Sequence, residues 1–124
     1  MIWVVVKIWF GTSGRQLLPT DASSNAAISF DGGLILSTGA NDAFTATGGG
    51  TVDVTTGGVE TTVATTTGTA VNIANTTIGG AVHFDDVSKN GTGSGIVLTN
   101  AGAGEFRGVG GVIQNTTGVG VDVD

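Results

Sequence analysis

Short runs of alternating apolar and polar residues follow one another along most of the chain, and each run ends at Gly, Asn or Thr. Alternation over four to six positions between glycine-rich clusters predicts β-strands with one buried face. No segment keeps the 3.6-residue period of an amphipathic helix, so we expect almost no helix. The predicted strands are residues 27–30, 34–38, 44–47, 51–56, 61–66, 70–74, 81–87, 96–99, 105–109, 112–116 and 120–124.

The pattern repeats every 25 residues. Residues 67–75 (TGTAVNIAN) align without gaps with residues 92–100 (TGSGIVLTN) and again with residues 117–124 (TGVGVDVD). Three short strands in 25 residues are too little chain for a four-stranded propeller blade, which takes about 40. They fit one coil of a solenoid that stacks on the next at about 4.8 Å. We therefore predict an all-β, right-handed parallel β-helix with about 25 residues and three short strands per coil.

Equivalent positions of successive coils should form columns along the solenoid axis. The inward columns of one face are Phe44, Val71, Ile96 and Val121, and Ala46, Ile73, Leu98 and Val123. At two corners, Asn75 lies one period before Asn100, and Asn90 lies one period before Asn115. Asparagine tolerates left-handed turn conformations, and stacked amides can hydrogen-bond along an axis. The sequence therefore predicts two structural asparagine ladders, Asn75 with Asn100 and Asn90 with Asn115.

Four phrases resemble a known class of protein: AFTATGGGTVDV at 43–54, TTTGTAVNIANTTI at 65–78, GIVLTN at 95–100 and GGVIQNTTG at 110–118. They are similar to the repetitive right-handed parallel β-helix regions of large bacterial secreted and surface proteins, which are adhesin-like or associated with autotransporters or hemolysin-type repeats. The resemblance implies an exported scaffold, extracellular or on a bacterial cell surface. It supplies no catalytic residue set, because the matching residues are corner and core positions.

Residues 1–25 depart from the repeat, so we divide the chain into an atypical N-terminal segment, 1–25, and the coils, 26–124. Residues 1–10 are apolar except for Lys7, too short for a transmembrane helix of about 20 residues, and unlike a signal peptide. Three interpretations remain open: a capping strand, a strand of a preceding coil, or a misassigned start. The sequence stops inside the strand 120–124, so we expect the coils to be truncated there. An uncapped coil would pair with further coils or associate end to end.

Charge and composition exclude several partners. The net charge is −6, and the four basic residues are scattered, which argues against nucleic acid. No apolar stretch is long enough for membrane insertion. Forty per cent hydrophobic residues with little charge favour a packed core over disorder. A neutral surface of Thr, Asn and Gly suits weak multivalent contact, so glycans or cell surfaces are the expected partners.

The preferred hypothesis is a non-catalytic structural or adhesive scaffold. The alternative is a carbohydrate-active β-helix, a polysaccharide lyase or hydrolase. Its polar column would contain Asp53, His83 and Arg107, with Asp85 nearby, because carboxylates with His and Arg can perform glycosidic chemistry. Against it, the scarce charge of this chain has to lie on strand faces and corners, where we expect Arg107 to pair with Glu105 or Asp53. An ice-binding solenoid would need a regular outward column of Thr, which the chain lacks.

No cofactor is expected. The hemolysin-type calcium pattern, Gly-Gly-x-Gly-x-Asp, does not occur in the chain. The one calcium hypothesis left is a site formed by Asp85, Asp86 and Glu105. A single His and no Cys argue against structural zinc.

Overall fold

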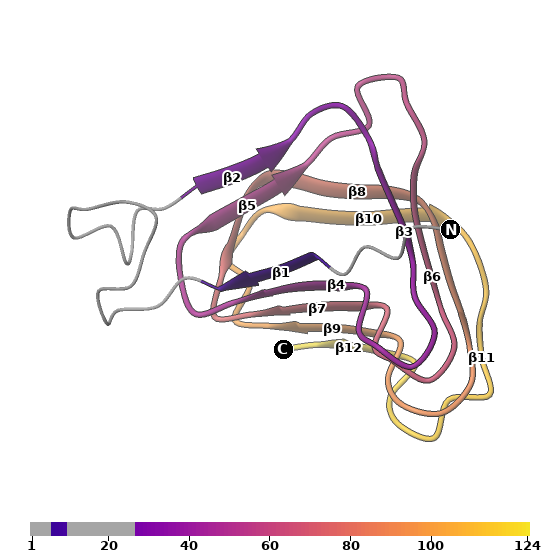
Figure 1. Cartoon of the computed structure of the whole chain (residues 1–124). Helices are drawn as coiled ribbons and strands as arrows, with labels where there is room; N and C mark the ends of the chain where they lie inside the picture. The colour runs from indigo at the N-terminus through magenta and orange to yellow at the C-terminus, as the bar shows by residue number, and fades with distance from the viewer. Residues whose placement is uncertain (1–5, 10–26) are drawn as a thin grey trace.

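The computed structural model describes residues 6–9 and 27–124, and these residues form a right-handed parallel β-helix of about four turns. Seen along the axis, each coil has three sides that enclose the core (Figure 1). All the strand pairs are parallel, and no helix occurs in the described part of the chain. The predicted all-β solenoid with coils of about 25 residues is confirmed.

The first face is a five-stranded sheet. In spatial order it contains β1 (Val6–Trp9), β4 (Phe44–Thr47), β7 (Val71–Ala74), β9 (Ile96–Thr99) and β12 (Val121–Val123). The register aligns Val71 with Ile96, and Ile96 with Val121, so each step along the sheet is 25 residues of chain. The predicted columns of this face are therefore present in the structure.

The other two faces form one bent seven-stranded sheet. The second face contains β2 (Ala27–Phe30), β5 (Thr51–Val54), the first part of β8 (Thr77–Asn90) and β10 (Glu105–Gly110). The third face contains β3 (Leu34–Ser37), β6 (Thr61–Thr65), the last part of β8 and β11 (Ile113–Gln114). β8 crosses the corner without a break, because it pairs with β5 and β10 on one side of the bend and with β6 and β11 on the other.

The limits of β8 differ from the predicted strand 81–87. Gly79 and Gly80 resemble a corner in the sequence, but they form an irregularity inside the strand, where the pairing with β5 shifts between Val52 and Val54. The strand also continues past Val87 to Asn90, because its backbone keeps pairing with β6 there. A glycine pair marks a bulge as readily as a turn, which explains the error.

Phenylalanine rings connect the coils inside the solenoid. The ring centroids of Phe30 and Phe44 are 6.3 Å apart, those of Phe44 and Phe84 5.5 Å, and those of Phe84 and Phe106 6.2 Å. The first two pairs meet edge to face, a favourable geometry for aromatic rings. Phe44 and Phe84 are completely buried. The coils therefore share one continuous core rather than stacking as separate layers.

Asparagines occupy corner positions that require a left-handed backbone. Asn75, Asn100 and Asn115 have φ values of 52°, 50° and 56°. The Asn100 Nδ2 donates to the Asn75 Oδ1 at 3.1 Å, and the Asn115 Nδ2 donates to the Asn90 Oδ1 at 2.8 Å. Each of the two corners therefore carries an amide hydrogen bond from one coil to the next.

Of the atypical segment 1–25, the structure describes residues 6–9. They form β1, which pairs in parallel with β4 from Val6 opposite Phe44 to Trp9 opposite Thr47. β1 thus adds one strand to the first face. The rest of that segment lies outside the described residues. Within the described residues there is no helix long and apolar enough to cross a membrane.

Candidate functional site

The polar residues of the outer second face lie in two different rows. His83 of β8 is directly opposite Arg107 of β10 in the next coil. On the other side of β8, Val54 is opposite Val82, so the residue that follows β5, Thr55, continues the row of His83. Asp53 is displaced from this row by the irregularity at Gly79 and Gly80. The structure brings His83 and Arg107 together, and it places Asp53 elsewhere.

Asp53 binds the backbone of the following coil. Its Oδ1 accepts hydrogen bonds from the N–H groups of Gly80 and Ala81, the latter at 3.2 Å. A Cβ at Gly79 would lie 2.7 Å from the Asp53 Oδ2 and 2.6 Å from the Thr51 Cγ2. The carboxylate and the missing side chain together hold the bulge of β8 in place.

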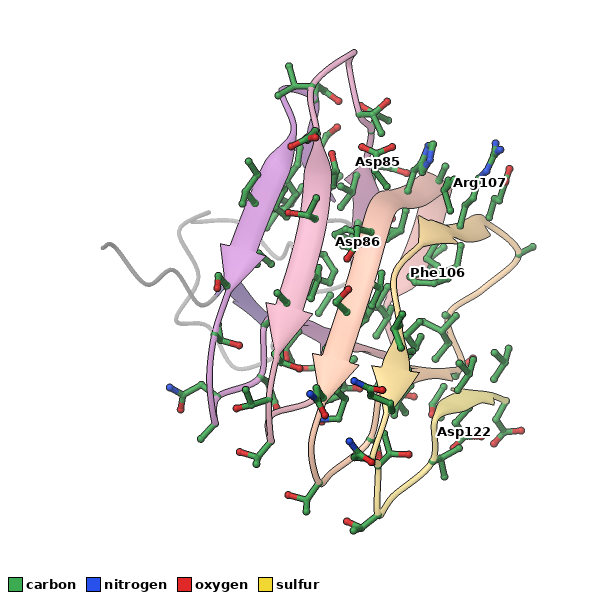
Figure 2. The ribbon with its side chains drawn as sticks, turned by 90° about the vertical axis from the view of Figure 1, so that its right-hand side faces the viewer. Asp85, Asp86, Phe106, Arg107 and Asp122 are labelled. Carbon is green, nitrogen blue, oxygen red and sulfur yellow. The ribbon has the colours of Figure 1, made fainter. Side chains whose placement is uncertain are left out.

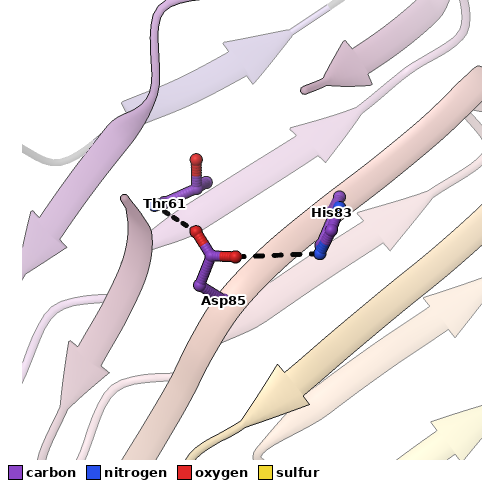
Figure 3. A network of polar contacts seen from close by, with 3 residues as sticks. All are labelled: Thr61, His83 and Asp85. Atoms are coloured by element: carbon purple, nitrogen blue, oxygen red, sulfur yellow. Dashed lines mark hydrogen bonds and ion pairs between the residues drawn. The ribbon is translucent and has the colours of Figure 1, made fainter. Parts of the chain in front are cut away.

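Asp85 also connects two coils, as Figure 3 shows. Its Oδ2 accepts a hydrogen bond of 2.9 Å from the backbone N–H of Thr61, and its Oδ1 lies 3.8 Å from the His83 Nε2. The side chains of His83 and Asp85 are 26% and 41% exposed, so both can be reached from solvent. The separation of 3.8 Å is too long for a hydrogen bond, so Asp85 acts on His83 only as a nearby negative charge.

Arg107 is exposed, and Figure 2 shows its side chain extending away from the sheet. Within the described residues it forms no ion pair, so the expected pairing with Glu105 or Asp53 is wrong. An exposed ion pair gains at most about 1 kcal/mol and restricts two long side chains, so the guanidinium can remain solvated instead.

The three acids of the calcium hypothesis do not converge. Glu105 is opposite Ala81, four positions before Asp85, which corresponds to about 13 Å along a strand. Asp86 accepts a hydrogen bond from the hydroxyl of Ser88. In the described ranges, no group of three or more acidic, His or Cys side chains is placed to hold a metal ion.

Two further aspartates have the same role as Asp53 and Asp85. The Asp42 Oδ1 accepts a hydrogen bond of 2.7 Å from the backbone N–H of Thr69, and the Asp31 Oδ1 accepts one of 3.2 Å from the hydroxyl of Thr55. In all four cases the partner is 24 to 28 residues away, about one coil. The sequence contains a usable signal for such bonds, since each aspartate has a candidate partner one period away.

Lys89 lies inside the solenoid rather than beside the outward polar residues. It is 1% exposed, on the same side of β8 as Val87. Its Nζ donates to the carbonyl oxygens of Thr66 at 2.8 Å and Gly68 at 2.5 Å, which belong to the corner of the preceding coil. Burial lowers the pKa of the Lys89 amine, and the negative charge of Asp42 opposes that shift.

The same corner is bonded from the inside in the two preceding coils. There the inward residue is a threonine: the Thr38 hydroxyl donates to the Asn41 carbonyl at 2.7 Å, and the Thr65 hydroxyl donates to the Gly68 carbonyl at 3.1 Å. Thr65 is directly opposite Lys89. Strict alternation from Val87 would have identified Lys89 as an inward residue.

Comparison of the chain with protein-family models, with curated proteins and with solved structures found no match. Function is therefore inferred from the geometry of the coils.

Proposed function

We propose that the chain is a non-catalytic structural and adhesive segment of a large bacterial extracellular or surface protein. One observation carries the proposal. Asp31, Asp42, Asp53 and Asp85, acids that a carbohydrate-active β-helix could have used for catalysis, accept hydrogen bonds from neighbouring coils. Polar side chains with this role hold a scaffold together.

The surface of the coils supports an adhesive role. Corner asparagines and threonines are exposed at regular intervals, among them Asn75, Asn100, Thr92 and Thr117. A flat face of neutral polar groups offers each partner molecule few contacts, so useful binding needs many copies acting together. Glycans and cell surfaces present such repeated groups, and we propose them as the partners.

The rival function is cleavage of a polysaccharide. The observation in its favour is that His83, Asp85 and Arg107 lie on neighbouring strands and reach the same outer face. A general acid and a base or nucleophile are both needed for glycoside hydrolysis, and they are two carboxyl groups in most such enzymes. Here Asp53 and Asp85 each accept backbone hydrogen bonds, which favour their ionised forms and oppose a role as the general acid.

A polysaccharide panel separates the two functions. The wild-type chain, His83→Ala, Arg107→Ala and the corner control Thr92→Ala are incubated with neutral and acidic polysaccharides, and both retained protein and released reducing ends are measured. The scaffold predicts no release by any of the four proteins. Release that His83→Ala abolishes and Thr92→Ala preserves would show that the chain is an enzyme.

The adhesive part of the proposal has its own test. The chain is coupled to beads at increasing density, and retention on immobilised glycans and on bacterial or host cells is recorded. Retention should rise steeply with density, because avidity supplies what a single chain lacks. Absence of retention at every density would reject the adhesive role and leave the structural one.

A further inference from the structure

The last coil exposes apolar surface that the other coils bury. Most of the exposed large hydrophobic side chains of the described chain are in this coil: Val109, Val112, Val119, Val121 and Val123. Val123 is 71% exposed, although its column neighbour Leu98 is only 6% exposed. Among the described residues, β12 pairs with β9 alone, so the backbone of its other edge is available.

A pocket of about 300 Å³ lies at this end of the core. Leu98, Phe106 and Val123 line it, together with the backbone of Gly102 and Gly104. It has the position that inward side chains of a further coil would fill. A partner for this end is therefore expected to have the cross-section of a β-helix coil.

β1 has a matching series of residues at the opposite end of the first face. The five strands of this face are in continuous register, so each residue of β12 shares a column with one residue of β1. The column partners are Val6 and Val121, Lys7 and Asp122, and Ile8 and Val123.

We infer that a second copy of this chain binds head to tail, with β12 of one molecule pairing in parallel with β1 of the next. In this register Val121 would be next to Val6, Val123 next to Ile8, and the negative Asp122 next to the positive Lys7. Opposite charges at directly paired positions stabilise strand pairing, and like charges destabilise it. Charge therefore selects this arrangement over a tail-to-tail dimer, which would bring two acidic β12 strands together.

Head-to-tail contacts are heterologous, so they do not close into a dimer and instead produce an open-ended fibre. The scaffold would then lengthen by association of copies as well as by additional coils within a chain. This inference goes beyond the proposed function and can fail independently of it, because a monomer could still serve as a scaffold.

The first test measures association of the chain by sedimentation velocity over a wide concentration range. Val123→Lys places a charge in the contact, and Val59→Lys makes the same change at an exposed valine in the loop between β5 and β6. The wild type and Val59→Lys should associate alike, and Val123→Lys should associate at least about tenfold more weakly because it loses a buried valine. A wild type that is monomeric at every concentration overturns the inference.

The second test determines the orientation, and the absence of native Cys makes it clean. Lys7→Cys and Asp122→Cys are treated with a short thiol cross-linker, each alone and then mixed. Cross-links should form in the mixture and remain few in each single variant. Efficient cross-linking of Asp122→Cys to itself would show a tail-to-tail contact and reject the head-to-tail one.

A third measurement covers the case in which Val123→Lys does not fold. Asp122→Lys changes only an exposed side chain and should weaken association by a few-fold. The double variant with Lys7→Asp restores opposite charges at the pair and should regain wild-type association. Asp122→Lys with undiminished association would contradict the charge pairing.

Discussion

Individual polar residues in this chain act mainly on the coil next to their own. Asn100 combines two requirements, because its backbone is left-handed at a φ of 50° and its side chain bonds to Asn75. Lys89 combines burial with two hydrogen bonds to a corner of the preceding coil. Both residues therefore contribute at a distance of one full coil along the sequence.

Substitution of Asn100 separates its two contributions. Asn100→Gly keeps the easy left-handed backbone and loses the amide bond, and should lower the free energy of unfolding by about 0.5–1.5 kcal/mol. Asn100→Ala loses both, and should lower it by about 1 kcal/mol more. Urea denaturation followed by circular dichroism measures both values, with Asn72→Ala on the outer strand surface as the control. Equal losses for Gly and Ala would argue against backbone strain at this corner.

Lys89 should make stability depend on alkaline pH. Its pKa in the folded chain is below the ordinary 10.5, so between these two values the unfolded chain holds a proton that the folded chain has released. The free energy of unfolding therefore rises as the pH rises through that interval. Lys89→Met should show a smaller rise, measured by urea denaturation from pH 7 to pH 10.5. Identical pH dependence of the two proteins would contradict a lowered pKa.

At the scale of strands and corners, close backbone approach between coils limits the side chains that fit. A Cβ at Gly68 would overlap the backbone carbonyl of Asn41 in the preceding coil, although Gly68 itself has no left-handed φ. Gly32 also lies at a bend, but no heavy atom is within 4 Å of its position for a Cβ. Space between coils, and not backbone freedom, decides the requirement for glycine at Gly68.

The pair of glycine-to-alanine variants tests this explanation. Gly68→Ala should lower the free energy of unfolding by about 1–3 kcal/mol, because the corner has to move away from the added methyl group. Gly32→Ala should change it by less than about 0.5 kcal/mol. Thermal or urea denaturation provides the comparison. A similar loss in both variants would mean that close packing of the corner is unimportant.

The sequence predicted the strands of the first face well and the site less well, for physical reasons. Inward positions such as Val71 and Ile96 repeat at a fixed period, because every coil has to fill the same core. Asp53 depends on the register between β5 and β8, and the bulge that sets this register has the same glycine-rich sequence as a corner. Lys89 was grouped with outward polar residues because charge usually indicates exposure, whereas its alternation with Val87 indicates burial.

At the scale of the whole molecule, the coils are joined on every side. Backbone pairing connects them on three faces, phenylalanine rings connect them through the core, and amide ladders connect them at two corners. The same regularity that joins the coils leaves a pairing edge at β12. Rigidity along the axis and a tendency to bind another coil therefore have a common origin.

Stacked coils also set how far such a protein can reach. Each coil uses 25 residues of this chain, as the register of β7 and β9 shows. It advances the axis by only about 4.8 Å, whereas the same residues in an α-helix would cover about 37 Å. A span of 100 Å would therefore take about 21 coils, or more than 500 residues. Such a protein gains breadth and stiffness cheaply and length slowly, which makes joining finished molecules end to end the most economical way to extend far from a surface.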